Sequence, residues 1–179
     1  MKAKMFALAV ALGLSGASLV YAGDSKEPAM QCCPMDPKAS AALEKVKALE
    51  GTWVAKPQAE GQPAMSVVFH PTSNGTAVME TMFPGTKEEM VNLFTASGDT
   101  IVMTHYCAMG NQPHMKLTPS DGKTMKFDFV DGGNIKAATD AHMHSVALTV
   151  DGDKLTEDWS FSNDGKVVDH KVFEFTKSK

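Results

Sequence analysis

From Thr52 to the C-terminus, polar and apolar residues alternate with a period of two, and clusters of Gly, Asp, Asn and Pro interrupt this pattern about every ten residues. The clearest alternation sets Met125, Phe127 and Phe129 against polar neighbours. A strand with this pattern buries one face and exposes the other, so an antiparallel meander is expected. The predicted strands are 52–56, 64–70, 76–83, 88–96, 100–107, 112–118, 123–130, 143–150, 154–162 and 166–176.

Consecutive hairpin-linked strands hide their edges best by closing on themselves. The predicted fold is therefore an all-β, about ten-stranded antiparallel up-and-down barrel that spans 37–179. One N-terminal helix precedes it, because Asp36 and Pro37 are typical of a helix start and an apolar stripe follows. We expect this helix to run from Pro37 to Glu50 and to cover one end of the barrel; its stripe is Leu43, Val46 and Leu49.

Residues 1–22 have the charged start, the apolar stretch and the small residues of a cleaved secretory signal peptide. A periplasmic or secreted protein is expected, with a flexible arm at 23–36 that contains Cys32 and Cys33. The residue directly after Ala22 is Gly23 rather than Cys, so a lipid anchor is not expected. No later stretch is apolar enough for an integral membrane segment.

The charge of the chain argues against nucleic-acid partners. Removing the leader takes two of 17 Lys+Arg and none of 21 Asp+Glu, which leaves 15 minus 21, or a net charge of −6. All of these cations are lysines, so the chain lacks the planar guanidinium group of arginine, which binds phosphate through two hydrogen bonds at once. The oligomeric state has no signature in the sequence.

Three cysteines are an odd number for an oxidising compartment, where thiols usually pair. Adjacent cysteines bridge each other only with strain, so a disulfide from Cys107 to Cys32 or Cys33 is the more natural pairing. The alternative is a set of free thiols, and Cys-Cys-Pro-Met could also offer soft ligands to Cu(I).

Two motifs place polar groups at spacing two within β-patterned segments. His105 and Cys107 share a face with Ile101 and Met103, and His142 and His144 share the face of Val146. Both faces are expected to point into the barrel. These four side chains are therefore candidate ligands of a metal ion, with Cu, Zn or haem iron as the metals considered.

Two carboxylates fall on apolar faces as well. Glu157 alternates in phase with Trp159, and Glu80 with Val78 and Met82. Buried carboxylates need partners or take up protons. A self-satisfied hydrogen-bond network, with no ligand at all, is the alternative interpretation of these buried groups.

The remaining histidines are expected outside the barrel. His70 and His114 lie beside prolines near strand ends, and His170 lies on the face opposite Phe173 and Phe175.

Two sets of residues resemble known barrels. Gly51-Thr52-Trp53 resembles the opening of lipocalin-like and nitrobindin-like (calycin) proteins. A longer set, covering roughly 43–176, resembles an uncharacterised family of exported bacterial lipocalin-like proteins: Glu80 to Thr86, Glu89 to Val91, His105 to Pro113, Phe127 to Val130 and His142 to Ser145.

The resemblance implies the barrel but no activity, and it implies an arginine where this chain has His114. In lipocalins an arginine near the last strand packs over the first-strand tryptophan. Because this chain has no arginine, Lys171 or Lys177 would have to replace it.

Three functions follow from these observations. The first is a non-enzymatic barrel that binds a small, partly apolar molecule; its expected ligand-binding residues are His105, His142, His144, Glu157, Trp159, Met103, Phe127 and Glu80. The second is a barrel that binds copper, zinc or haem. The third is an enzyme in which His105 or His144, paired with Glu157, moves protons.

Overall fold

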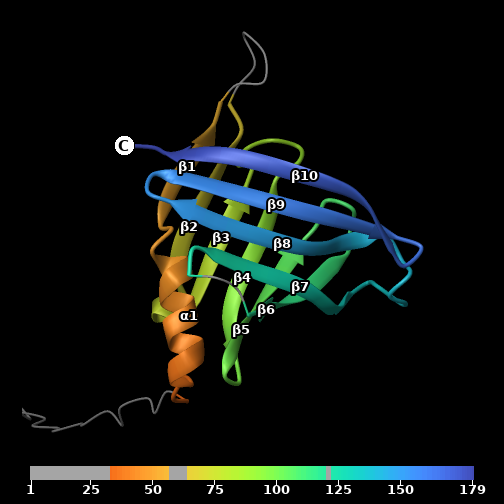
Figure 1. The fold of residues 1–179 in the computed structure, drawn as a ribbon, viewed down its shortest axis with the longest axis horizontal. Helices are drawn as coiled ribbons and strands as arrows, with labels where there is room; N and C mark the ends of the chain where they lie inside the picture. Colours follow the sequence, from red (N-terminus) through yellow and green to blue (C-terminus); the bar gives the residue numbers. More distant parts are fainter. Residues whose placement is uncertain (1–32, 57–63, 120–121) are drawn as a thin grey trace, which may run out of the picture. The chain divides into compact units, whose positions relative to one another are not determined.

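The structure is a computed structural model that describes residues 33–56, 64–119 and 122–179. The elements all lie in the unit Pro34–Lys179, and their order can be followed in Figure 1. They are α1 (Pro37–Lys47), β1 (Gly51–Ala55), β2 (Ser66–Thr72), the short η1 (Ser73–Gly75), β3 (Ala77–Met82), β4 (Met90–Ser97), β5 (Thr100–Tyr106), β6 (Gln112–Thr118), β7 (Thr124–Gly133), β8 (His142–Asp151), β9 (Lys154–Asn163) and β10 (Lys166–Lys177).

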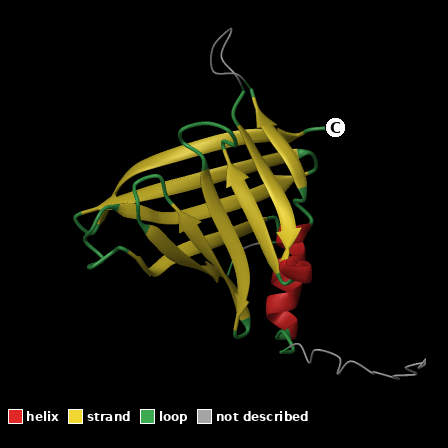
Figure 2. Ribbon diagram, turned by 180° about the vertical axis from the view of Figure 1, so that it is seen from behind, coloured by secondary structure: helices red, strands yellow, loops and turns green. Residues whose placement is uncertain are grey.

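The ten strands form one closed antiparallel barrel, in which each strand pairs with its neighbours in the chain. The circle closes where β1 pairs with β10, with Trp53 opposite Lys177 and Ala55 opposite Phe175. Figures 1 and 2 show the strands wrapping around from opposite sides. The predicted barrel with one N-terminal helix is confirmed.

Successive hairpins place their turns at alternating ends of the barrel, and α1 lies at one of these ends. The side chain of Lys38 in α1 comes within 4.0 Å of Asp99 in the β4–β5 turn. At the other end of α1, Lys47 lies against Gly75 in the β2–β3 turn. The β3–β4, β5–β6 and β7–β8 loops therefore lie at the end that α1 does not cover.

The start of α1 is the predicted one. The Asp36 side chain accepts a hydrogen bond of 2.8 Å from the backbone N–H of Lys38, and Pro37 occupies the first turn. The helix stops at Lys47, earlier than the predicted Glu50, because the chain must turn into β1 at Gly51, whose φ of 118° lies in the region that glycine favours.

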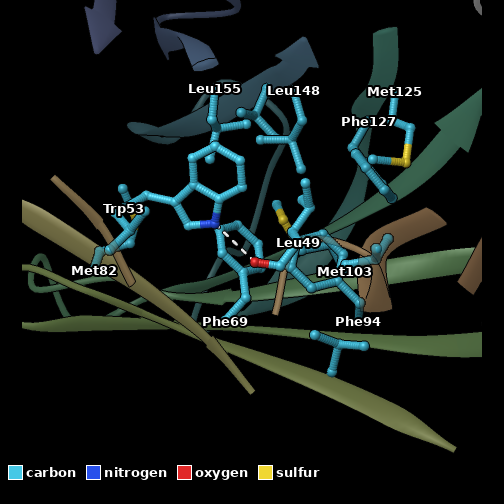
Figure 3. Packing of buried hydrophobic residues seen from close by; sticks show 14 of the residues in the cluster. Leu49, Trp53, Phe69, Met82, Phe94, Met103, Met125, Phe127, Leu148 and Leu155 are labelled. Carbon is cyan, nitrogen blue, oxygen red and sulfur yellow. Dashed lines mark hydrogen bonds between the residues drawn. The ribbon is translucent and has the colours of Figure 1, made fainter. Parts of the chain in front are cut away.

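Aromatic and aliphatic side chains fill the middle of the barrel (Figure 3). Phe94 lies between Phe69 and Phe127, at ring-centroid distances of 6.4 and 5.4 Å. The indole N–H of Trp53 donates to the Leu49 carbonyl at 2.7 Å, which ties the end of the helix to the first strand. Burial of these rings is the main source of the barrel's stability.

The position over the Trp53 ring is taken by a lysine, as expected for a chain without arginine. Lys177 Nζ lies 5.1 Å from the ring centroid, within the range of a cation–π contact. Of the two lysines considered, Lys177 is the one at this position.

Several sequence predictions fall on residues 1–32, which lie outside the described residues: the signal peptide, most of the arm, and Cys32. Within the described residues, neither Cys33 nor Cys107 takes part in a disulfide. The disulfide from Cys107 to the arm stays a prediction, because one of its two possible partners is not described. Within the described ranges, no helix is both long and apolar enough to cross a membrane.

We expect Leu43→Ala to lower the free energy of unfolding by about 2–5 kcal/mol, because Leu43 is fully buried between helix and barrel. Urea unfolding measures this loss. Lys45→Ala, on the exposed face of the same helix, is the matched control and should change stability by less than about 0.5 kcal/mol. Equal effects of the two substitutions would contradict the packing of α1.

Candidate functional site

A row of three polar side chains crosses the inner face of the barrel. Glu80 in β3 lies opposite Asn92 in β4, which lies opposite His105 in β5. All three are at most 1% exposed. Sequence reasoning identified Glu80 and His105 but missed Asn92, although Asn92 alternates in phase with the buried Phe94 and could have been found by the same rule.

Asn92 joins the two others. Its Nδ2 donates to Glu80 Oε2 at 2.8 Å and to Met82 Sδ at 3.4 Å, and its Oδ1 lies 2.6 Å from His105 Nδ1. Because Oδ1 can only accept, the hydrogen must sit on Nδ1 of His105. In the neutral ring the other nitrogen, Nε2, then carries a lone pair.

The lone pair on His105 Nε2 is buried and has no hydrogen-bond partner among the residues that the structure describes. Burial lowers the pKa of His105 from its ordinary value to about 4, so the ring is neutral at physiological pH. An acceptor that is buried without a donor costs free energy. His105 Nε2 is therefore one of three atoms of this network without a partner among the described residues; the others are Oε1 of Glu80 and Oε1 of Glu157.

Glu80 also meets Glu157, which comes from β9 across the interior. Both are fully buried, and Oε1 of each carboxyl group has no donor among the residues that the structure describes. The two groups interact with each other, and one proton shared between them would satisfy both. Burial is the main cause of the raised pKa of both groups, and the neighbouring charge of Glu157 raises the pKa of Glu80 further. The Trp159 indole N–H donates to Glu157 Oε2 at 3.0 Å.

A cavity of about 260 Å³ lies beside this network, toward the end of the barrel that α1 leaves open. His105 and Trp159 form part of its wall, with their rings 4.9 Å apart. Exposed Glu88 and Lys171 stand at its mouth. The other lining residues are mainly apolar or sulfur-containing: Met82, Phe83, Met90, Cys107, Ala108, Met143 and Phe173.

Cys107 is half-buried in this wall, and burial raises the pKa of its thiol. The thiol is therefore protonated at neutral pH, which disfavours a nucleophilic role.

A larger recess, of about 500 Å³, lies along β10 between Lys56 and Lys154. Its polar lining residues are exposed or partly exposed, unlike those of the network around His105. Its lining residues Lys56 and Met65 lie on either side of the undescribed residues 57–63 in the sequence. The smaller cavity is therefore the better candidate site.

His142 and His144 do not line the cavity, although Met143 between them does. The β8–β9 pairing shifts between Met143 and Ser145, so that His144 is the extra residue of a β-bulge and the alternation of Val146 is interrupted there. His142 is 1% exposed, as expected for an inward residue, whereas His144 is partly exposed.

The two histidines form a pair of their own. His142 Nε2 lies 3.2 Å from His144 Nδ1, and the Phe129 ring is 4.0 Å from the His142 ring. His105, Cys107, His142 and His144 thus do not form one cluster. In the described part of the chain, no three His, Cys, Asp or Glu side chains are arranged to hold a metal ion.

The other predicted residues can now be placed. Trp159 lines the cavity, Glu80 and Glu157 lie behind its wall, and Met103 and Phe127 belong to the hydrophobic core rather than to the cavity. The surface predictions are confirmed for His70, which is exposed, for His114, which pairs with Asp131, and for His170, whose Nδ1 is 3.4 Å from Asp158.

No family model and no curated protein matches this chain.

We expect Glu80→Gln to change how stability depends on pH. The folded protein keeps a proton on the Glu80–Glu157 pair above pH 4.5, the ordinary pKa of the free carboxyl group, whereas the unfolded chain loses it. Stability contributed by this pair is therefore present at lower pH and is lost as the pH rises toward the raised pKa. The glutamine side chain at position 80 would still accept the hydrogen bond from Asn92, and its N–H could donate to Glu157. The contact between residues 80 and 157 would then need no shared proton.

Urea unfolding from pH 4.5 to 9 tests this effect. The loss of the His105 contribution as the pH falls from 6.5 toward about 4 is common to both proteins, so it cancels in their difference. As the pH rises above 4.5, the wild-type stability should fall relative to that of Glu80→Gln, by up to about 1.4 kcal/mol per pH unit. The exposed Glu174→Gln is the control. Parallel curves for wild type and Glu80→Gln would refute the shared proton.

Proposed function

We propose that the barrel is a non-enzymatic binding protein for a small, uncharged, largely apolar ligand. The ligand lies in the cavity beside Trp159, and its polar group donates a hydrogen bond to His105 Nε2. One observation carries this proposal: a buried lone pair without a partner in the described residues stands in the wall of a largely apolar cavity. A ligand with one O–H or N–H supplies the missing donor.

The size of the cavity limits the ligand. An apolar cavity of about 150 Å³ can hold benzene, and drug-sized ligands occupy about 300 to 1,000 Å³. The volume of about 260 Å³ lies between these values. It favours a molecule of one or two rings, or a short branched chain, over one as large as haem.

The electrostatics of the wall favour a neutral ligand. His105 is uncharged at neutral pH, and Glu88 and Lys171 stand at the solvent-exposed mouth rather than deep in the cavity. A charged group inside would lose its water without gaining an opposite charge.

Cu(I) is the second candidate occupant. The same cavity is lined by the thiol of Cys107 and the thioethers of Met82, Met90 and Met143, beside the free imidazole nitrogen of His105. Thiol, thioether and imidazole are the ligands that Cu(I) prefers. Native mass spectrometry of protein purified from its own host separates copper from an organic ligand by mass.

Acid–base catalysis is less well supported than binding. A pKa of about 4 makes His105 a weak base at neutral pH. Its bonded partner is Asn92, while Glu157 is bonded to Glu80 and Trp159.

We further propose that the protein is exported and belongs with the bacterial lipocalin-like proteins it resembles. The leader pattern of residues 1–22 supports export, and the resemblance together with the barrel supports the family. N-terminal sequencing of the protein from its host should give Gly23 as the first residue; an intact Met1 would contradict export by cleavage.

Phenol and anisole test the proposed hydrogen bond. Both rings fit a cavity of this size, but only phenol has a donor. We expect the wild type to bind phenol at least about tenfold more tightly than anisole in calorimetric titrations, because anisole leaves Nε2 unpaired. Phenol should also shift the ¹⁵N resonance of Nε2.

His105→Phe keeps an aromatic ring beside Trp159 and removes the acceptor, so the preference for phenol should disappear. The exposed His170→Phe is the matched control and should keep it. If His105→Phe fails to fold, the ¹⁵N shift in the wild type still decides the matter. Equal binding of phenol and anisole, or an unchanged Nε2 resonance with phenol bound, would refute the hydrogen bond.

A further inference from the structure

The pair His142 and His144 lies apart from the cavity and plays no part in the function proposed above. Both residues belong to the bulged start of β8, which lies between β7 and β9 in the barrel (Figure 1). Because His142 and His144 are two residues apart, alternation along the strand places both imidazoles on one face. Neither lines the cavity that Met143 helps to form, and the pairing with β9 shifts at His144.

The tautomer of His142 is fixed by the backbone. Its Nδ1 lies 2.6 Å from the carbonyl oxygen of Asp140, which can only accept, so Nδ1 carries the hydrogen. In the neutral ring, Nε2 then presents a lone pair to His144 Nδ1 at 3.2 Å. In the metal-free protein, the N–H at Nδ1 of His144 donates a hydrogen bond to this lone pair.

We propose that His142 Nε2 and His144 Nδ1 together chelate a divalent transition-metal ion such as Zn²⁺. Two nitrogens 3.2 Å apart, each about 2.0–2.1 Å from one ion, subtend an angle of about 100° at the metal, close to tetrahedral. The ion would replace the hydrogen between the rings. The hydrogen on His144 moves from Nδ1 to Nε2, so both rings stay neutral and the protein releases no proton.

The surroundings of His142 are those of a metal ligand. A ligating histidine generally donates its second ring N–H to a carboxylate or a backbone carbonyl, which fixes the ring, and Asp140 O has this role here. The loop that carries this carbonyl is itself held, because the Asp140 carboxylate accepts from the backbone N–H groups of Lys136 and Ala137 at 2.8 and 3.2 Å. Phe129 packs against the His142 ring.

His144 provides access from solvent, because it is partly exposed whereas His142 is 1% exposed. The negative charge of Asp128 acts on His144, and Lys126 opposes it. A net attraction for a cation at this point is therefore small. With two protein ligands, the remaining positions on the ion would be taken by water, so the site is open and its affinity is expected to be moderate.

Zinc titration of the full chain, prepared without an affinity tag, tests the proposal. We expect the wild type to bind one Zn²⁺ more than His144→Gln, or to bind it at least about tenfold more tightly. Thiols contribute equally to both proteins, so the comparison isolates the imidazole pair. The exposed His114→Gln is the matched control and should bind zinc as the wild type does.

A second measurement does not depend on a variant. Bound Zn²⁺ should shift the ¹⁵N resonances of His142 Nε2 and His144 Nδ1 and leave Nδ1 of His142 protonated. Identical zinc binding by wild type and His144→Gln, or unchanged resonances of these two nitrogens at saturating zinc, would overturn the proposal. Neither result would affect the phenol experiment, because that ligand binds at His105.

Discussion

The antiparallel pairing of β1 with β10 is the contact on which the rest of the structure depends. It turns a row of hairpins into a closed surface, and only a closed surface has an inside that water does not reach. Trp53 reinforces this seam twice, since its N–H donates to the carbonyl of Leu49, just after α1, and its ring lies under Lys177 of β10. Once the interior is dry, each polar side chain that points inward must find a partner there.

The interior meets this requirement almost completely, and the incomplete part is informative. A proton shared by Glu80 and Glu157 removes one of two buried charges, and Trp159 and Asn92 donate to the charge that remains. Asn92 then uses its oxygen to hold Nδ1 of His105. Of the described buried atoms that have no hydrogen-bond partner, Nε2 of His105 is the one whose residue lines the cavity, where a ligand can reach it.

Most of the architecture could be predicted from the sequence because alternation and turn residues are local signals. The same local rule correctly placed His105 inside and His170 outside. It could not foresee the register shift at His144, because nothing in His-Met-His indicates a β-bulge, and so it grouped His142 and His144 with His105 in one site although they do not line its cavity. Contacts between distant strands could not be predicted either: Glu80 and Glu157 meet across the interior from β3 and β9, which are not neighbours in the sheet.

The barrel places its buried and partly buried histidines in two different surroundings. His105 lies beside two carboxyl groups and lines the cavity, whereas His142 and His144 lie outside the cavity lining and contact each other and Phe129. Met143, which stands between them in the chain, supplies an apolar thioether to the cavity wall and keeps that wall suited to a neutral ligand. Because His142 is buried and His144 is partly exposed, a metal ion held by the pair would meet its water ligands on the side of His144.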